Sequence, residues 1–162
     1  MTDFLLFDEE FQLIKDLIGR LKADAQAKVV FIVDKNGQQI AAQGDLESLD
    51  TTSLASLTAG NVAATDGLAR LIGEKEFPVL FHEGERDNVY ISIVAQRVIL
   101  VVIFDERSSL GLVRLRVKRA TQDLEKIFEA IQRKVESEKD RTDVDSPFAE
   151  ITDDDIDSLF RD

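Results

Sequence analysis

The amino-acid sequence predicts an α/β protein: a three-layer α/β/α sandwich around a central antiparallel five-stranded sheet. Helical and strand-like patterns follow one another in the order helix, two strands, helix, three strands, helix. The connections between consecutive strands are short enough for hairpins, which pair strands in antiparallel fashion. The last strand-like run, residues 98–104, is apolar at every position, as expected of a central strand that is covered on both faces.

The first helix is expected over residues 8–25, where apolar side chains recur at three- and four-residue intervals. Two strands follow, in the runs KVVFIVDK and QQIAA. Asn36 and Gly37 separate them, and this pair is a strong hairpin signal because a two-residue turn needs positive φ at both positions.

Three more strands and a long helix complete the predicted domain. The first of these strands begins after Pro78, and a proline at that place is typical of an edge strand. An edge strand exposes unpaired backbone groups, so two subunits could join their sheets there, through a residue such as Phe81. The last helix is expected over residues 109–136.

The run DTTSLASLTAGNVAATDGLARLIGE, residues 50–74, predicts a helix with one nearly bare face. Small residues recur on this face at spacings of four, three and four, at Ser56, Gly60, Ala63 and Gly67. A glycine inside a helix costs about 1 kcal/mol relative to alanine, so something must approach this backbone closely. The alternatives are the protein's own sheet, a partner protein or a second copy of the helix. Because the leucines at 54, 57, 68 and 71 could supply the core-facing side, helix-to-helix contact between subunits is favoured.

Composition sets further bounds. The chain has 162 residues, of which 44% are hydrophobic, enough for one globular domain, expected over residues 1–136. It has no cysteine, no signal-peptide pattern and no apolar run long enough to cross a membrane, so a cytoplasmic location without membrane insertion is expected. The net charge of −12 argues against a nucleic-acid partner.

Charge is unevenly distributed along the chain. Five basic residues lie at positions 107–119, and no acidic residue occurs from position 107 until Asp123. This strip indicates either a surface for an acidic partner or a solvated helix face. Residues 137–162 are strongly acidic and are expected to be a linker and a C-terminal docking segment, disordered when unbound. This segment carries apolar residues that a mere solubility tail would not need. They are Phe148, Ile151, Ile156, Leu159 and Phe160.

Motifs for catalysis, metal binding or cofactors are not recognisable in the sequence. It contains no glycine-rich phosphate loop, no nucleophile elbow and no Cys/His metal spacing. The one histidine, His82, falls in a strand and is expected to be structural. We therefore expect no catalytic residue, no metal and no cofactor of the chain's own.

Several of these segments together resemble the roadblock/light-chain-seven family, which has a profilin-like fold. The resemblance covers most of the chain and is carried by the runs AKVVFIVDKNGQ, DTTSLASLTAGNVAA, GLARLIGE, VVIFDERSSLGLVRLR and SPFAEITDDDIDSLF. It implies a homodimer joined through edge strands and through the helices at residues 50–74. It also implies that the dimer activates a Ras-like small GTPase in its GTP form and so regulates cell polarity and motility, with concentration at a cell pole.

The resemblance implies that the activator remodels the GTPase instead of inserting an arginine, although a trans-acting Arg116 or Arg119 remains an alternative. Exposed positions of the first and last helices are expected to form one binding face, because both helices pack on the same side of the sheet. The expected GTPase contacts are Gln12, Lys15, Arg116, Lys118 and Arg119. The competing hypothesis is a non-catalytic scaffold that recruits polarity or motor proteins without changing GTP hydrolysis.

Overall fold

The computed structural model of the chain describes residues 8–145, with side chains through residue 138. Within this range the chain forms three helices and five strands in the predicted order. They are α1 (Asp8–Asp24), β1 (Val29–Asp34), β2 (Gln39–Gly44), α2 (Thr51–Ile72), β3 (Val79–Glu83), β4 (Asn88–Val94), β5 (Val98–Phe104) and α3 (Leu110–Asp145).

The strands form one antiparallel sheet with the order β2-β1-β5-β4-β3. Every residue of β5 and of β1 is buried, which confirms the prediction that the apolar run at 98–104 is a central strand. The strand that follows Pro78 is β3, and it lies at one edge as predicted.

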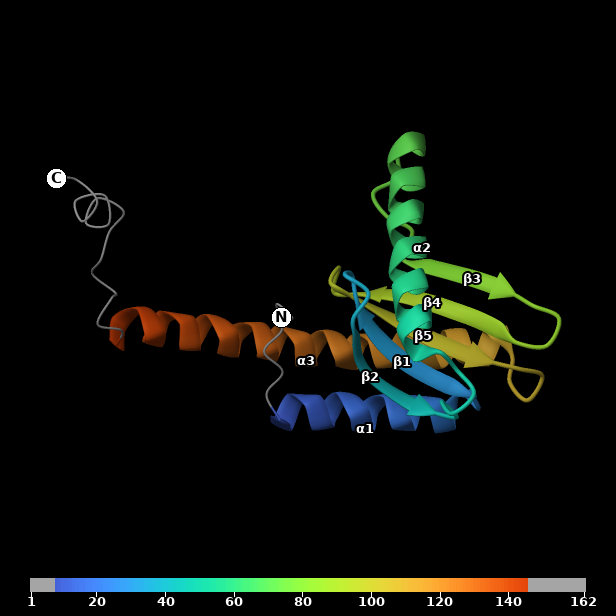
Figure 1. Cartoon of the computed structure of the whole chain (residues 1–162), viewed down its shortest axis with the longest axis horizontal. Helices are drawn as coiled ribbons and strands as arrows, with labels where there is room; N and C mark the ends of the chain where they lie inside the picture. Colours follow the sequence, from blue (N-terminus) through green and yellow to red (C-terminus); the bar gives the residue numbers. More distant parts are fainter. Residues whose placement is uncertain (1–7, 146–162) are drawn as a thin grey trace.

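Helices cover both faces of this sheet, as a three-layer sandwich requires. Figure 1 shows α1 and α3 side by side on one face and α2 on the other. The larger core fills the space under α1 and α3 and includes Ile14, Leu100 and Leu124. The smaller core lies under α2 and includes Phe31, Val62 and Val101. The predicted fold class is confirmed.

The orientation of α2 differs from the expectation. Asp50 caps its first turn by accepting a hydrogen bond from the Ser53 N–H at 3.1 Å, and Gly73 ends it at φ 81°. The helix packs on the sheet through its smaller side chains, and its leucines at 57, 68 and 71 are exposed. The prediction that the leucines form the core-facing side is therefore wrong for these three, whereas Leu54 does pack against the smaller core. Short side chains let the helix approach the sheet closely, and the C-terminal half of α2 stands clear of the strands (Figure 1).

The hairpin between β1 and β2 is also built differently. Gly37 has φ 91°, but Asn36 does not have positive φ, so the expected two-residue turn is wrong. The Gly37 N–H donates to the Asp34 carbonyl at 3.1 Å, which closes a wider turn followed by a left-handed glycine. The Asp34 carboxylate fixes this shape, because it accepts the N–H groups of Asn36 and Gln38 at 2.9 Å each.

The last helix extends beyond its predicted end. It continues to Asp145, so residues 137–145 are helical and the expected change to a linker at residue 137 is wrong. Residues 137–145 contain a single apolar residue, Val144, so no periodic apolar stripe marks this part of the helix in the sequence. The five apolar docking residues, from Phe148 to Phe160, lie outside the described residues.

Candidate functional site

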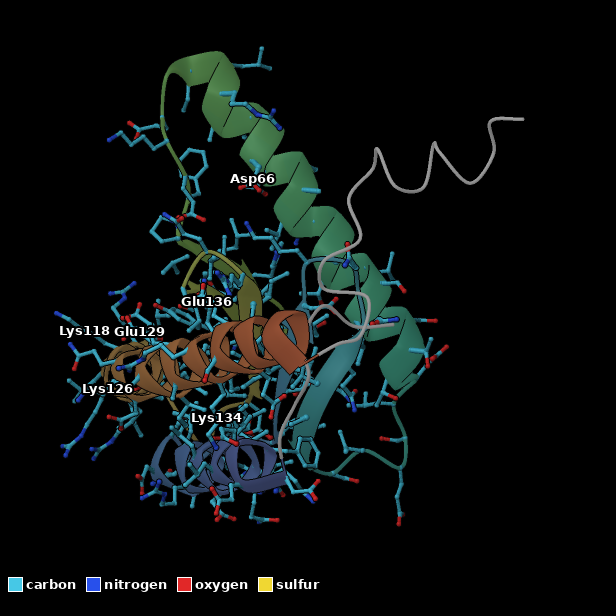
Figure 2. The ribbon with its side chains drawn as sticks, turned by 90° about the vertical axis from the view of Figure 1, so that its left-hand side faces the viewer. Asp66, Lys118, Lys126, Glu129, Lys134 and Glu136 are labelled. Atoms are coloured by element: carbon cyan, nitrogen blue, oxygen red, sulfur yellow. The ribbon has the colours of Figure 1, made fainter. Side chains whose placement is uncertain are left out.

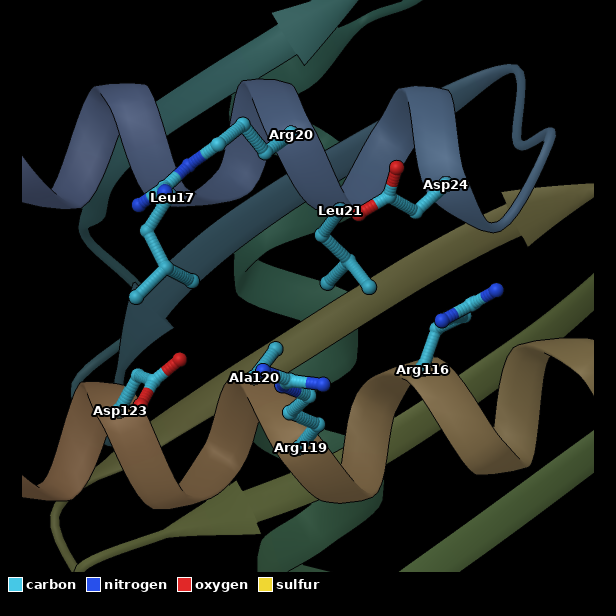
Figure 3. A pocket seen from close by; sticks show the side chains of 8 residues that line it. All are labelled: Leu17, Arg20, Leu21, Asp24, Arg116, Arg119, Ala120 and Asp123. Carbon is cyan, nitrogen blue, oxygen red and sulfur yellow. The ribbon is translucent and has the colours of Figure 1, made fainter.

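A groove of about 320 Å³ lies between α1 and α3, on the side of the sheet away from α2. The two helices run antiparallel, since Glu10 near the start of α1 meets Lys134 far along α3. In Figure 3 side chains from the two helices project toward each other across the groove, with Arg116 opposite Asp24. Its lining residues are Leu17, Arg20, Leu21, Asp24, Arg116, Arg119, Ala120 and Asp123.

The groove holds three arginines and two aspartates over an apolar floor. Within residues 8–138, none of the three guanidinium groups forms an ion pair. The Nε atom of Arg116 is buried and has no hydrogen-bond acceptor among the described residues. Because buried donors in folded proteins are nearly always paired, this group is suited to an acceptor brought by another molecule or segment.

The structure brings together only part of the predicted GTPase-binding set. Arg116 and Arg119 line the groove. Lys118 is exposed about 160° around the helix axis from Arg116, since successive helical residues are about 100° apart. Figure 2 shows Lys118 pointing outward at one end of α3, whereas Lys134 lies between α3 and α1.

The two predicted contacts on α1 lie away from the groove. Gln12 is exposed and donates to Asp16 at 2.8 Å, while Lys15 lies over the Phe11 ring at 5.7 Å from its centroid. The Lys15 carbonyl accepts the Gln43 side-chain amide of β2, so this flank of α1 faces β2. The prediction that all five residues form one continuous face is wrong.

Three polar residues that line the groove were not among the binding residues predicted from the sequence: Arg20, Asp24 and Asp123. Each is one helical turn from another lining residue, at a spacing of four in α1 or of three and four in α3. That spacing was visible in the sequence. The pairing of α1 with α3 and its offset were not, because both depend on how the helices pack on the sheet.

A second candidate surface is the outer face of α2. Ser56, Gly60 and Ala63 are exposed and Gly67 is half-buried. A Cβ atom added at Gly60 or Gly67 would meet nothing within 4 Å, so the protein's own sheet does not require these glycines. Leu57, Leu68 and Leu71 lie beside this small-residue stripe, and together they leave a broad apolar helix face without a partner in residues 8–138.

Phe81, the predicted dimer residue of the edge strand, lies on the other side of the sheet. Its ring stacks on Phe104 with centroids 6.1 Å apart, and Phe104 belongs to the core under α1 and α3. The residue is 36% exposed. Phe81 is therefore not contiguous with the small residues of α2, although the outer edge of β3 beside it has no neighbouring strand in the described part of the chain.

His82 connects β3 with α2. Its Nε2 atom lies 2.9 Å from the side-chain nitrogen of Asn61, a contact between the edge strand and the helix above it. No group of three or more metal-ligating side chains occurs in the part of the chain that the structure describes. In that same part, no helix combines the length and apolar character needed to cross a membrane.

The sequence matches the Roadblock/LC7 domain over residues 13–104, more than half of the chain. This chain belongs to the Roadblock/LC7 family. It is 61% identical to MglB of Myxococcus xanthus in a structural match with a TM-score of 0.75, which covers 78% of this chain and 96% of that one. The gliding protein MglB of Thermus thermophilus is 31% identical, with a TM-score of 0.75 and coverage of 80% and 98%.

Further solved structures extend these similarities. A protein described as MglB with tetrameric arrangement is 30% identical over 81% of this chain and 98% of that chain, with a TM-score of 0.76. Profilin IB of Acanthamoeba castellanii is 15% identical over 71% of this chain and 96% of that chain, and its TM-score of 0.53 indicates a shared fold alone. None of the curated proteins matches this chain.

Proposed function

We propose that this protein is an MglB-like GTPase activator that works as a homodimer. It binds the Ras-like small GTPase MglA in the GTP form and accelerates hydrolysis, which regulates cell polarity and motility. The observation that carries this proposal is the 61% identity with MglB along 78% of the chain. The chain contributes no catalytic group of its own. It orders the GTPase so that the GTPase's own residues position the attacking water and the charge on the phosphate.

The dimer is formed by α2 and by the edge of β3. Leu57, Leu68 and Leu71 supply apolar area that a second copy of α2 can bury. The adjacent stripe at Ser56, Gly60, Ala63 and Gly67 lets the two helix backbones come close. Antiparallel pairing of β3 with its copy would continue the sheet across the two-fold axis and bring the two Phe81 residues near each other.

The GTPase contacts the groove between α1 and α3. Arg116 and Arg119 bind acidic side chains of the GTPase, and the Arg116 Nε, which has no acceptor among the described residues, gives one such side chain a buried partner. Lys118, Gln12 and Lys15 lie outside the groove and act at its margins by steering and by fixing the register. The C-terminal segment, with Phe148, Ile151, Ile156, Leu159 and Phe160, binds a second surface of the GTPase.

The test is phosphate release from GTP-loaded MglA in single turnover, with and without the purified dimer. Faster release supports the activator, whereas binding without any change in rate identifies the scaffold function. Ala63→Arg places a large cation in the proposed dimer stripe of α2 and is expected to dissociate the dimer. If this variant stays dimeric and loses all stimulation, the GTPase docks on α2 and the groove assignment is wrong.

A further inference from the structure

None of the charged side chains that line the groove between α1 and α3 forms an ion pair within residues 8–138. Three guanidinium groups and two carboxylates surround an apolar floor made by Leu17, Leu21 and Ala120. The buried Nε of Arg116 adds a donor that lacks an acceptor among the described residues. A fitting occupant has carboxylates for the arginines, a cation for Asp24 or Asp123, and apolar side chains for the floor.

The chain contains a segment with these properties in its last six residues, DSLFRD. Asp157 and Asp162 supply two carboxylates, Arg161 supplies one cation, and Leu159 and Phe160 supply the apolar side chains. We propose that residues 157–162 fold back and occupy the groove of their own subunit when no GTPase is bound. The occupancy itself is independent of the proposed function, and its regulatory consequence rests on that function.

Chain length selects this segment over the rest of the acidic tail. Along α3, Asp145 is about 33 Å from Asp123 and about 44 Å from Arg116 at 1.5 Å per residue. An extended chain covers at most about 3.6 Å per residue. Asp155 then reaches about 36 Å beyond Asp145 and falls short of Arg116, whereas Asp162 reaches about 61 Å. Residues 157–162 are therefore the part of the tail that can lie along the whole groove.

Occupancy of the groove would make the tail an internal competitor. The same Arg116 and Arg119 side chains would bind either the carboxylates of the tail or those of the GTPase, but not both at once. An arriving GTPase would displace the tail and release Leu159 and Phe160 for contact with another surface. Because the competing contacts are charged and accessible to solvent, added salt would weaken the closed state.

A cross-linking experiment tests the occupancy directly, since the full-length protein contains no cysteine. Ser158→Cys is combined with Asp123→Cys in the groove, and in a matched control with Glu129→Cys. Glu129 is also exposed, is nearer to Asp145 along α3, and lines a different groove beside the β4–β5 hairpin. Disulfide formation under mild oxidation is followed by non-reducing electrophoresis and by mass spectrometry of the linked peptides.

The expected result is an intrachain disulfide that forms at least ten-fold faster for the Asp123 pair than for the Glu129 pair. In 0.5 M salt this advantage shrinks, and Asp157→Asn with Asp162→Asn reduces it as well. Equal rates for the two pairs, or a faster Glu129 pair, overturn the proposal. A disulfide found only between two chains overturns the assignment to the same subunit.

The regulatory consequence has a separate measurement. Asp157→Asn with Asp162→Asn, in a chain without added cysteines, is expected to raise the association rate with GTP-loaded MglA about three-fold or more at low salt. If the disulfide forms as expected but this rate is unchanged, the competition is wrong while the occupancy stands. If MglA does not bind at all, the proposed function fails, and the cross-linking result still decides the occupancy.

Discussion

The Glu10 carboxylate lies 2.5 Å from the Lys134 ammonium nitrogen. Glu10 is buried, with only 5% of its surface exposed. This contact ties the first turn of α1 to α3, more than one hundred residues further along the chain. The hydrogen bond from Lys134 holds the pKa of the Glu10 carboxyl below its usual value, although burial acts in the opposite direction. The same hydrogen bond raises the pKa of Lys134.

Replacing Glu10 by glutamine is expected to lower the Tm by about 2–5 °C at neutral pH, because a charge-assisted contact across the helix pair is lost. A lowered carboxyl pKa stabilises the fold above the unfolded-state value and loses this effect as the pH falls through the folded-state value. The difference in Tm between wild type and Glu10→Gln should therefore be largest above about pH 5 and become smaller below about pH 4. Thermal unfolding followed by circular dichroism across this range measures it.

Glu9→Gln is the matched control for this prediction. Glu9 lies 3.8 Å from the same Lys134 nitrogen, but its side chain is 87% exposed. We expect a change in Tm below about 1 °C, since exposed ion pairs contribute little. Equal losses in the two variants would show that the buried contact has no special role.

Leu71 on α2 is expected to support the dimer and not the folded subunit. Its surface is 85% exposed in the single chain. Leu71→Asp should leave the Tm of the dilute protein nearly unchanged but raise the dimer dissociation constant about 100-fold or more, because one buried leucine per subunit is lost at about 1.5 kcal/mol or more each. Sedimentation velocity over a range of concentrations measures this change.

Leu115→Asp provides the comparison. Leu115 is also largely exposed, at 62%, but it lies on α3, across the sheet from α2. Its substitution should leave the dimer intact. If Leu115→Asp dissociates the dimer and Leu71→Asp does not, the two-fold interface lies on the helix-pair side of the sheet.

Some features of the fold could be predicted from the sequence, and the orientation of α2 could not. The central position of β5 and the edge position of β3 depend on local patterns, and both were predicted. The inward face of α2 was not, because the usual rule places the largest apolar side chains in the core. Here Ala55, Ala59 and Val62 face the sheet while Leu57, Leu68 and Leu71 are exposed.

The residues that line the groove could be predicted from the sequence only in part. Arg116 and Arg119 were identified from the local density of positive charge, and the structure does place both in one groove. Gln12 and Lys15 were grouped with them only because two helices were expected on one side of the sheet. The rotation of α1 and its antiparallel offset against α3 decide which side chains meet, and these follow from core packing that no local pattern specifies.

The hairpin between β4 and β5 offers a stabilising substitution. Ala95 and Gln96 both have positive φ, 53° and 58°, a conformation that costs non-glycine residues about 1 kcal/mol or more each. Asn and Gly are the residues preferred in such two-residue turns. Ala95→Asn with Gln96→Gly should raise the Tm by about 2–4 °C in a thermal melt.

Gly37→Ala tests the same reasoning in the opposite direction. Gly37 has φ 91°, and an added Cβ would lie 3.3 Å from the Ser56 Cα atom. We expect the Tm to fall by about 3 °C or more, because the substitution combines backbone strain with a close contact to α2. An unchanged Tm would mean that this turn relaxes freely, and it would weaken the case for strain in the β4–β5 turn as well.

Substitutions in the groove can distinguish arginines that dock the GTPase from an arginine that enters its active site. Arg116→Ala with Arg119→Ala should lower the stimulated kcat/KM about 10- to 100-fold, mainly through weaker binding, since these arginines are proposed to dock the GTPase and not to enter its active site. Arg133→Ala, an exposed arginine further along α3, is the control and should have little effect. Single-turnover phosphate release at several dimer concentrations separates binding from chemistry. A loss of about 10³ in the saturated rate from one alanine substitution would instead identify a trans-acting arginine and overturn the positioning mechanism.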